Sequence, residues 1–184
     1  MFRTLVQLII AVGICMNLTA CSNTFSWDEE VKLLDGRVIT VQQKRRFDDS
    51  RMPREAWLSF KLPEFGDKEI LWHEALDTMV LNVYKGKLYV VGVANGLLEY
   101  QQYGCPEPNY IAFRHDKDQW VRIPFNEIPE AIYDANMWFE NMVNYKIKNV
   151  TIDEKDTRLL WNKGYMPYQR RIDPKHISNL KNTY

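Results

Sequence analysis

The sequence has no excess of either charge, and it lacks the short motifs that identify common catalytic sites. Its 24 basic and 24 acidic residues cancel, which disfavours nucleic acid or an anionic membrane surface as the main partner, because both attract basic proteins. It contains no Gly-x-Ser-x-Gly, phosphate-binding loop or dinucleotide-binding fingerprint. We therefore assign no catalytic residue and no cofactor. Hydrolysis by carboxylates stays open as an alternative, since glycosidase carboxylates have no fixed spacing in sequence.

Residues that bind metals are few and scattered. The chain has three histidines, His73, His115 and His176. None of them forms a pair at the spacing of a zinc site. The acidic run Asp153, Glu154 and Asp156 lacks the glycine and terminal glutamate of a calcium-binding loop, and it suits a helix N-terminus, where acids complement the helix dipole. No metal site is predicted.

Cysteine is also scarce, and one of the three cysteines is the most informative residue of the chain. Leu18-Thr19-Ala20-Cys21 ends an apolar run that starts at Leu5, as in bacterial lipoprotein signals, where the cysteine thiol takes a diacylglycerol. The run is shorter than the ~20 apolar residues of a membrane-spanning helix, so a cleavable signal is favoured over an uncleaved anchor. Ser22 is not the aspartate that retains Gram-negative lipoproteins at the inner membrane. We expect attachment through Cys21 to the outer membrane, facing the periplasm.

This signal sets the predicted organisation: a signal peptide over 1–20, a lipidated tether over 21–27 and one β-rich globular domain over 28–184. Removal of Cys15 and acylation of Cys21 leave Cys105 without a disulfide partner. We expect Cys105 to be a packed thiol, because no Cys-His-Asn pattern surrounds it. A nucleophile and an intermolecular bridge are the alternatives.

Hairpin signals dominate the domain. Asp35-Gly36 separates two apolar runs and predicts a two-residue turn. That turn would pair Leu33 with Val38 and Val31 with Thr40, with apolar residues on both faces, so we expect both faces to be covered near the turn.

Three further strand pairs or strands are expected. Lys85-Gly86 predicts a second two-residue turn that pairs Val83 with Leu88. Residues 110–114 and 119–123 should pair around a polar loop, and residues 97–103 are expected to add a strand. The fold class is therefore mainly β: an antiparallel, hairpin-rich sheet, sandwich or barrel-like, of about seven to nine strands.

The C-terminal part has helix signals instead. Pro129 suits the first turn of a helix that runs to Ala135. Thr151 and Glu154 form a capping-box pair, in which each side chain accepts the other's backbone N–H. A short helix is expected after Pro174. One or two short C-terminal helices complete the prediction.

Two sets of residues are candidates for a binding surface. The basic residues Lys44, Arg45, Arg46, Arg51 and Arg54 could attract an anionic partner such as lipopolysaccharide, but nearby acids dilute them, and a solvated loop is the preferred interpretation. The aromatic residues could form a sugar- or peptide-binding face. Trp57 alternates away from its apolar neighbours, which makes it the aromatic residue expected to be exposed or to face a second layer.

Two segments resemble a group of uncharacterised small proteobacterial lipoproteins. One runs from Trp27-Asp28-Glu29-Glu30-Val31 into Leu34-Asp35-Gly36-Arg37. The other runs from Tyr103-Gly104, through Pro106, Pro108 and Asn109-Tyr110-Ile111, to Trp120-Val121-Arg122-Ile123-Pro124. The resemblance implies neither an activity nor site residues.

The preferred hypothesis is a lipid-tethered binding or structural module without catalysis, with an envelope protein or a glycan as partner. The alternatives are a cell-wall or glycan hydrolase and a periplasmic inhibitor that exposes a rigid loop, such as 63–68 or 104–109. A cleft lined by two acids without a basic partner would favour the hydrolase. The ligand-binding residues are not identified by the sequence.

Overall fold

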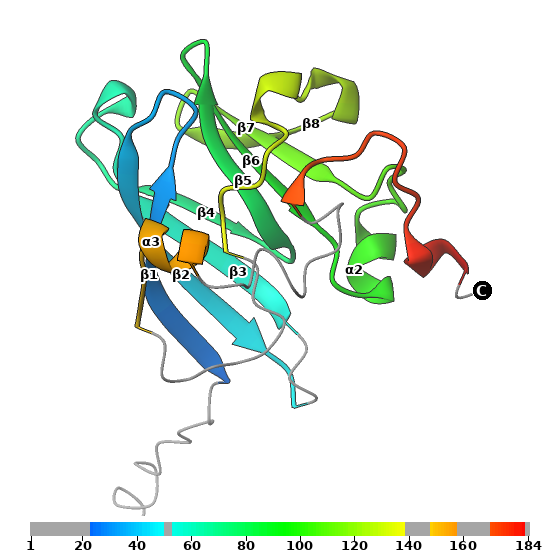
Figure 1. Ribbon diagram of the computed structural model, residues 1–184. Coiled ribbons are helices and arrows are strands. Elements are labelled where there is room, and N and C mark those ends of the chain that lie inside the picture. Colours follow the sequence, from blue (N-terminus) through cyan, green and yellow to red (C-terminus); the bar gives the residue numbers. More distant parts are fainter. Residues whose placement is uncertain (1–22, 50–52, 139–147, 158–169, 183–184) are drawn as a thin grey trace, which may run out of the picture.

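The computed structural model describes residues 23–49, 53–138, 148–157 and 170–182, and within them the chain is mainly β (Figure 1). Nine strands form two sheets, one of five strands in the order β4-β3-β2-β1-β9 and one of four in the order β5-β6-β7-β8. Neighbouring strands are antiparallel except β1 and β9. The expected hairpin-rich sandwich is confirmed, and no closed barrel forms among the described strands.

The five-stranded sheet contains β1 (Thr24–Lys32), β2 (Val38–Phe47), β3 (Pro53–Phe60), β4 (Ile70–Glu74) and β9 (Asn149–Val150). The four-stranded sheet contains β5 (Asp77–Tyr84), β6 (Lys87–Val93), β7 (Ile111–Asp116) and β8 (Gln119–Ile123). The helices are α2 (Leu97–Gln102) and α3 (Ile152–Thr157), with 3₁₀ turns η1 (Pro63–Phe65), η2 (Phe125–Glu127), η3 (Glu130–Ile132) and η4 (Asn179–Asn182). Strand β1 begins at Thr24, inside the segment 21–27 that was expected to be a tether.

Two of the predicted hairpins are confirmed with their register. Val83 lies opposite Leu88, and the turn residues Lys85 and Gly86 both have positive φ, as a type I′ turn requires. Strands β7 and β8 pair around Lys117 and Asp118, which also have positive φ.

The first hairpin forms, but its predicted register is wrong by one residue. Val31 lies opposite Ile39, and the Leu33 N–H donates to the Arg37 carbonyl at 2.8 Å, which leaves a three-residue loop. Of the loop residues only Gly36 has positive φ, at 88°, so the turn places glycine alone in the left-handed region. The expectation that both faces are covered here is also wrong, because Leu34 is 50% exposed.

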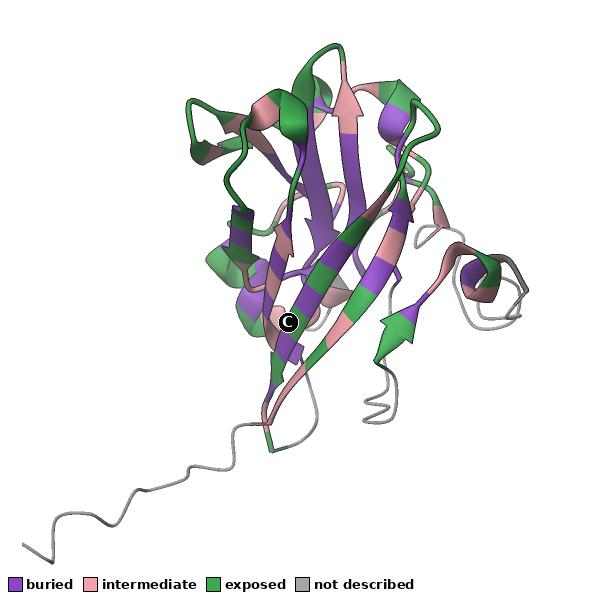
Figure 2. Cartoon of the chain, turned by 90° about the vertical axis from the view of Figure 1, so that its left-hand side faces the viewer, coloured by how far each residue is buried: buried purple, intermediate pink, exposed green. Residues whose placement is uncertain are grey.

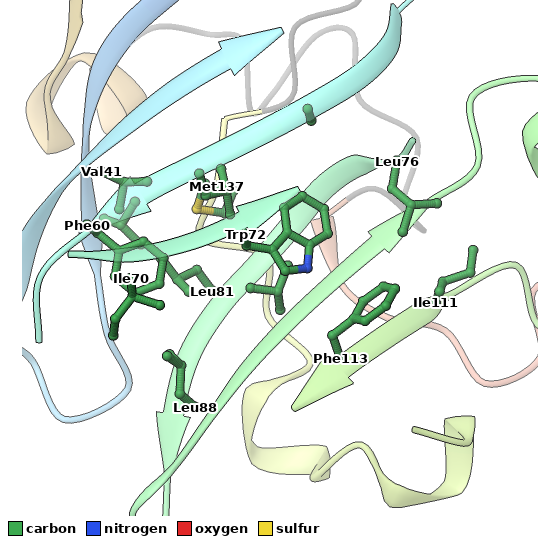
Figure 3. Close-up of a cluster of buried hydrophobic side chains, with 14 of the residues drawn as sticks. Val41, Phe60, Ile70, Trp72, Leu76, Leu81, Leu88, Ile111, Phe113 and Met137 are labelled. Atoms are coloured by element: carbon green, nitrogen blue, oxygen red, sulfur yellow. The ribbon is translucent and has the colours of Figure 1, made fainter. Parts of the chain in front are cut away.

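Two apolar cores lie on the two faces of the four-stranded sheet. The larger core fills the space between the sheets, where Trp72 from β4 meets Phe113 from β7 edge to face (Figure 3). The smaller core lies on the opposite face, where Ile128, Ile132 and Ile172 cover β5 and β6. The outer face of β1 and β2 stays exposed, which gives these strands the alternating buried and exposed residues in Figure 2.

Three sequence-based expectations are overturned by tertiary packing. Residues 97–103 were expected to be a strand but form α2, because Leu97, Tyr100 and Tyr103 recur every three residues and pack against the core on one side of a helix. The charged stretch that was expected to be a loop continues β2 to Phe47, because alternate residues turn into the sandwich.

The third expectation was the helix from Pro129 to Ala135. It shortens to η3, because the following residues turn aside to pair with the C-terminal segment. The Tyr133 carbonyl accepts the Ile172 N–H at 2.9 Å, and Asp134 forms an isolated bridge with Arg171.

The capping box of α3 is confirmed. The Glu154 N–H donates to Thr151 Oγ1 at 3.2 Å, and the Thr151 N–H donates to the Glu154 carboxylate at 3.1 Å. The expected short helix after Pro174 takes the form of η4.

The sandwich has two distinct ends. The turns at 33–37, 61–69, 85–86 and 117–118 form one end, which we call the turn end. A two-residue connection, Ala75-Leu76, carries the chain from β4 into β5 at the opposite end, where β1 begins and α2 lies (Figure 1). We call this the tether end.

Candidate functional site

A cleft of about 640 Å³ lies where the end of β1 meets β5, η3 and α3. Its volume is within the range of small-molecule sites in proteins. Its polar lining residues are Lys32, Asn82, Asp134, Asn136, Lys155 and Arg170. Its apolar lining residues are Leu33, Leu34, Ala131, Ala135 and Ile152. The cleft therefore offers both apolar side chains and hydrogen-bonding groups.

Two asparagines hold the β1 side of the cleft against β5. Asn136 accepts the Leu81 N–H at 3.0 Å and donates to the Leu81 and Lys32 carbonyls at 2.7 and 2.9 Å. Asn82 Oδ1 accepts the Leu34 N–H at 2.7 Å. The hydrogen bonds to Lys32 and Leu34 fix the first hairpin relative to the four-stranded sheet. No strand of the hairpin pairs with a strand of that sheet.

The α3 side of the cleft is fixed by a buried ion pair. Lys155 Nζ lies 2.5 Å from Glu29 Oε1 on β1 and donates to the Asn136 carbonyl at 2.8 Å. Glu29 also accepts the Trp138 N–H at 2.6 Å and a hydrogen bond from Gln43 Nε2. One carboxylate thereby joins four segments of the chain. The ion pair is enclosed and fully compensated, as buried charges must be.

The charges that remain in the cleft are positive. Lys155 is neutralised by Glu29, and Asp134 is neutralised by Arg171 at 2.5 Å. Lys32 and Arg170 have no acidic partner among the described residues. Among the described residues, the lining contains one acid and three basic residues, so no pair of acids that would favour the hydrolase hypothesis is found there.

A second buried ion pair lies between the sheets at the tether end. Arg45 Nη1 on β2 donates to Asp77 Oδ1 on β5 at 2.8 Å, and both side chains are almost completely buried. Burial raises the pKa of Asp77 to about 6, against the opposing attraction of Arg45. Because the charges are enclosed, they hold the sheets together and are not available to a ligand.

Three of the five basic residues suggested as an anion-binding cluster, Arg45, Arg46 and Arg54, form ion pairs with acids. Arg46 pairs with Glu55 at 2.5 Å, and Arg54 pairs with both Asp48 and Glu99 at 2.7 Å. Arg51 lies outside the described residues. The interpretation of these residues as a solvated loop is wrong, because they belong to or flank two paired strands.

Trp57 takes part in a row of side chains on the outer face of the five-stranded sheet. Its ring stacks on His73 of β4, with centroids 4.4 Å apart and planes within 6°, and Lys44 Nζ of β2 lies 4.8 Å from the Trp57 centroid. The cross-strand neighbours on β2 and β4 therefore engage the indole from both sides. A sugar would have to displace one of them to stack on Trp57.

The other residues considered from the sequence are spread over the molecule. His115 contacts Phe65 and Trp120 at the turn end, and His176 lies 6.2 Å from the Tyr110 ring centroid. Cys105 is exposed, so the expectation of a packed thiol is wrong. Cys21 lies outside the described residues.

None of the cleft residues was predicted from the sequence to be part of a site. They come from five segments between Lys32 and Arg170, and only the fold brings them together. The capping box at Thr151 was a usable signal, because it located the start of the helix that contributes Ile152 and Lys155. No sequence pattern identified Asn82 or Asn136 as binding-site residues.

Metal-ligand clusters and membrane-spanning helices are both absent from the described residues. No group of three or more His, Cys, Asp and Glu side chains is arranged there to hold a metal ion. None of the helices in those residues is both long and apolar enough to cross a membrane.

Comparisons with protein-family models, with curated proteins and with solved structures found no match to this chain. The resemblance to small proteobacterial lipoproteins therefore stays a prediction from the sequence.

Proposed function

We propose that the protein is a lipid-anchored binding module of the cell envelope, attached through Cys21 to the outer membrane and facing the periplasm. The observation that carries the binding role is the cleft of about 640 Å³ beside the first hairpin. Its walls are held by Asn82, Asn136 and the Glu29–Lys155 pair, so the cleft exists before any ligand binds. A preformed site binds without a cost for ordering its walls.

The position of the cleft along β1 supports the anchored arrangement. Strand β1 starts at Thr24, three residues after Cys21, and Lys32 at its other end lines the cleft. The eight residue-to-residue steps from Thr24 to Lys32 span about 26 Å in an extended chain. A lipid on Cys21 would hold the tether end at the bilayer and leave the cleft accessible from the periplasm.

The anchor is tested by growing cells with a fatty-acid analogue that can be labelled. We expect label on the wild-type protein and none on the Cys21→Ala variant. An unlabelled wild-type protein, or label that survives Cys21→Ala, would contradict the lipid anchor.

The binding role is tested by site-specific photo-crosslinking in intact cells. A crosslinker at Leu34, on the rim of the cleft, should capture a specific envelope component, whereas a crosslinker at Gln42, on the exposed outer face of β2, should not. Capture of the same components from both positions, or of none from Leu34, would contradict a binding role for the cleft.

A periplasmic inhibitor is the second candidate, and one observation favours it. Arg37 binds both carboxylate oxygens of Glu64, at 3.1 and 2.6 Å, and so fixes the 63–68 loop at the turn end. A rigid, exposed loop is what an enzyme inhibitor presents. In that case a crosslinker at Asp67 would capture a partner enzyme, and one at Leu34 would not.

A further inference from the structure

Asn82 is a buried polar residue with half of its amide group unused. The residue is 5% exposed and lines the cleft. Its Oδ1 accepts the Leu34 N–H at 2.7 Å and the Val83 N–H at 3.1 Å. Two N–H donors on the same side require the oxygen there, so the orientation of the amide is fixed and the NH₂ group occupies the other side.

The NH₂ group of Asn82 donates to none of the described residues. That nitrogen is not among the buried polar atoms left without a partner, so water reaches it in the free protein. A ligand acceptor placed at this group would take the place of that water.

Two cations lie on the same cleft. Lys32 and Arg170 both line it, and neither is paired with an acid among the described residues. Asp134, the one acid among the described lining residues, is already bound to Arg171. The ligand groups that meet an amide donor and two cations most favourably are the oxygens of an anion.

Part of the lining is apolar. Leu33, Leu34 and Ile152 come from the first hairpin and α3, and Leu34 is 50% exposed. These side chains would be covered by a short aliphatic part of the ligand, whose burial is favourable in proportion to its area.

We infer that the cleft binds a small organic anion whose carboxylate or phosphate group meets Asn82, Lys32 and Arg170 and whose aliphatic part lies on Leu34 and Ile152. This inference rests on the proposed binding role of the cleft and adds the chemical class of its ligand. The oxyanion is the chemistry shared by fatty-acid and phosphate-ester ligands.

The test is calorimetric titration of the full chain in lipid nanodiscs, with empty nanodiscs as the reference. The probes are hexanoate, hexyl phosphate and the uncharged hexanamide. We expect at least one anion to bind about tenfold more tightly than hexanamide, as hydrogen bonds to a charged group allow. Tighter binding of hexanoate would identify a carboxylate ligand, and tighter binding of hexyl phosphate would identify a phosphate ester. Equal affinity for all three probes, or binding of none, would overturn the inference.

Two variants locate the binding to this cleft. Asn82→Asp keeps the oxygen that accepts the Leu34 and Val83 N–H groups and replaces the NH₂ donor, so anion affinity should fall about tenfold or more. Lys32→Gln removes an exposed charge without disturbing the fold, and should weaken the same probes. The matched control is Lys68→Gln, an exposed lysine in the 61–69 loop, which should leave affinity unchanged. Undiminished affinity in both cleft variants would overturn the assignment.

The outcomes also separate this inference from the proposed function. Specific crosslinking from Leu34 together with equal affinity for hexanoate and hexanamide would leave a binding module and reject the anionic ligand. Absence of any crosslink from Leu34 would reject the binding role itself.

Discussion

One buried carboxylate, that of Glu29, links several segments of this protein. Glu29 lies in the middle of β1, yet its oxygens bind Lys155 of α3, the Trp138 N–H and Gln43 of β2. Its sequence neighbours Asp28 and Glu30 point to the opposite face of the strand. The three acids are alike in sequence, and only the register of the sheet distinguishes the buried one.

We predict that Glu29→Gln lowers the free energy of unfolding by about 3 kcal/mol, because it leaves the buried Lys155 charge without a counter-ion. Urea denaturation measures the change. Asp28→Asn, on the exposed face of the same strand, is the control and should change stability by less than about 0.5 kcal/mol. A loss of similar size in both variants would contradict the structural role of Glu29.

The raised pKa of Asp77 should make the free energy of unfolding decrease as the pH rises. Burial raises the pKa of Asp77 from 3.8 to about 6, so the folded state holds a proton that the unfolded state releases. The stabilisation of the folded state that comes from protonated Asp77 is fully present below pH 3.8. It is lost as the pH rises through about 6.

We therefore expect the stability difference between the wild type and Asp77→Asn to change by about 2 kcal/mol between pH 4 and pH 7, in favour of the wild type at the lower pH. Urea unfolding at intervals of one pH unit measures this. A difference that is constant across the range would show that Asp77 does not titrate there.

At the scale of elements, the first hairpin depends on one glycine. Gly36 has φ of 88°, and a Cβ at this position would meet nothing within 4 Å, so any cost of substitution comes from the backbone alone. Gly36→Ala should cost about 1 kcal/mol of stability. Gly36→Asn should cost less, because asparagine tolerates the left-handed region. Thermal unfolding would measure the stability of both variants. Equal losses of stability would contradict the view that the loss comes from the backbone conformation at position 36.

The elements also show what the sequence could predict. The turns at Lys85-Gly86 and Lys117-Asp118 and the capping box at Thr151 were predictable, because local chemistry determines each of them. The first hairpin was assigned the wrong register, since Asp35-Gly36 suits both a two-residue and a three-residue turn and the packing of Val31 decides between them.

Long-range contacts decided the remaining elements and the site. Arg45 occupies a core position of β2 because Asp77, far away in the sequence, compensates its charge. Asn82 and Asn136 meet the first hairpin through contacts that no local pattern encodes. The candidate cleft could therefore not be predicted from the sequence, although the fold class could.

At the scale of the whole molecule, the separation of the tether end from the turn end predicts how a lipid-anchored protein is oriented relative to the bilayer. If Cys21 carries the lipid, α2 at the tether end should lie near the bilayer, and the turn at Lys117 should lie far from it. The ten residues of β2 give the sandwich a length of about 33 Å between these ends.

This orientation can be measured with spin labels at Leu98→Cys and Lys117→Cys, each combined with Cys105→Ser, in protein held in nanodiscs. Both positions are exposed, so labelling should leave the core intact. We expect lipid-bound quenchers to affect the label at position 98 more strongly. Equal or reversed quenching would contradict the arrangement.

If the chain is exported as proposed, the parallel pairing of β1 with β9 delays completion of the first strand. Asp28 pairs with Asn149, and Glu29 needs Lys155, so the first strand is completed by residues more than a hundred positions later. A chain secreted N-terminus first would deliver β1 to the periplasm with the Glu29 carboxylate unpaired until residues 149–155 have crossed. Final assembly of the sandwich would then be post-translocational, and the exposed edge of β1 would be the surface that a periplasmic chaperone has to shield in the interval.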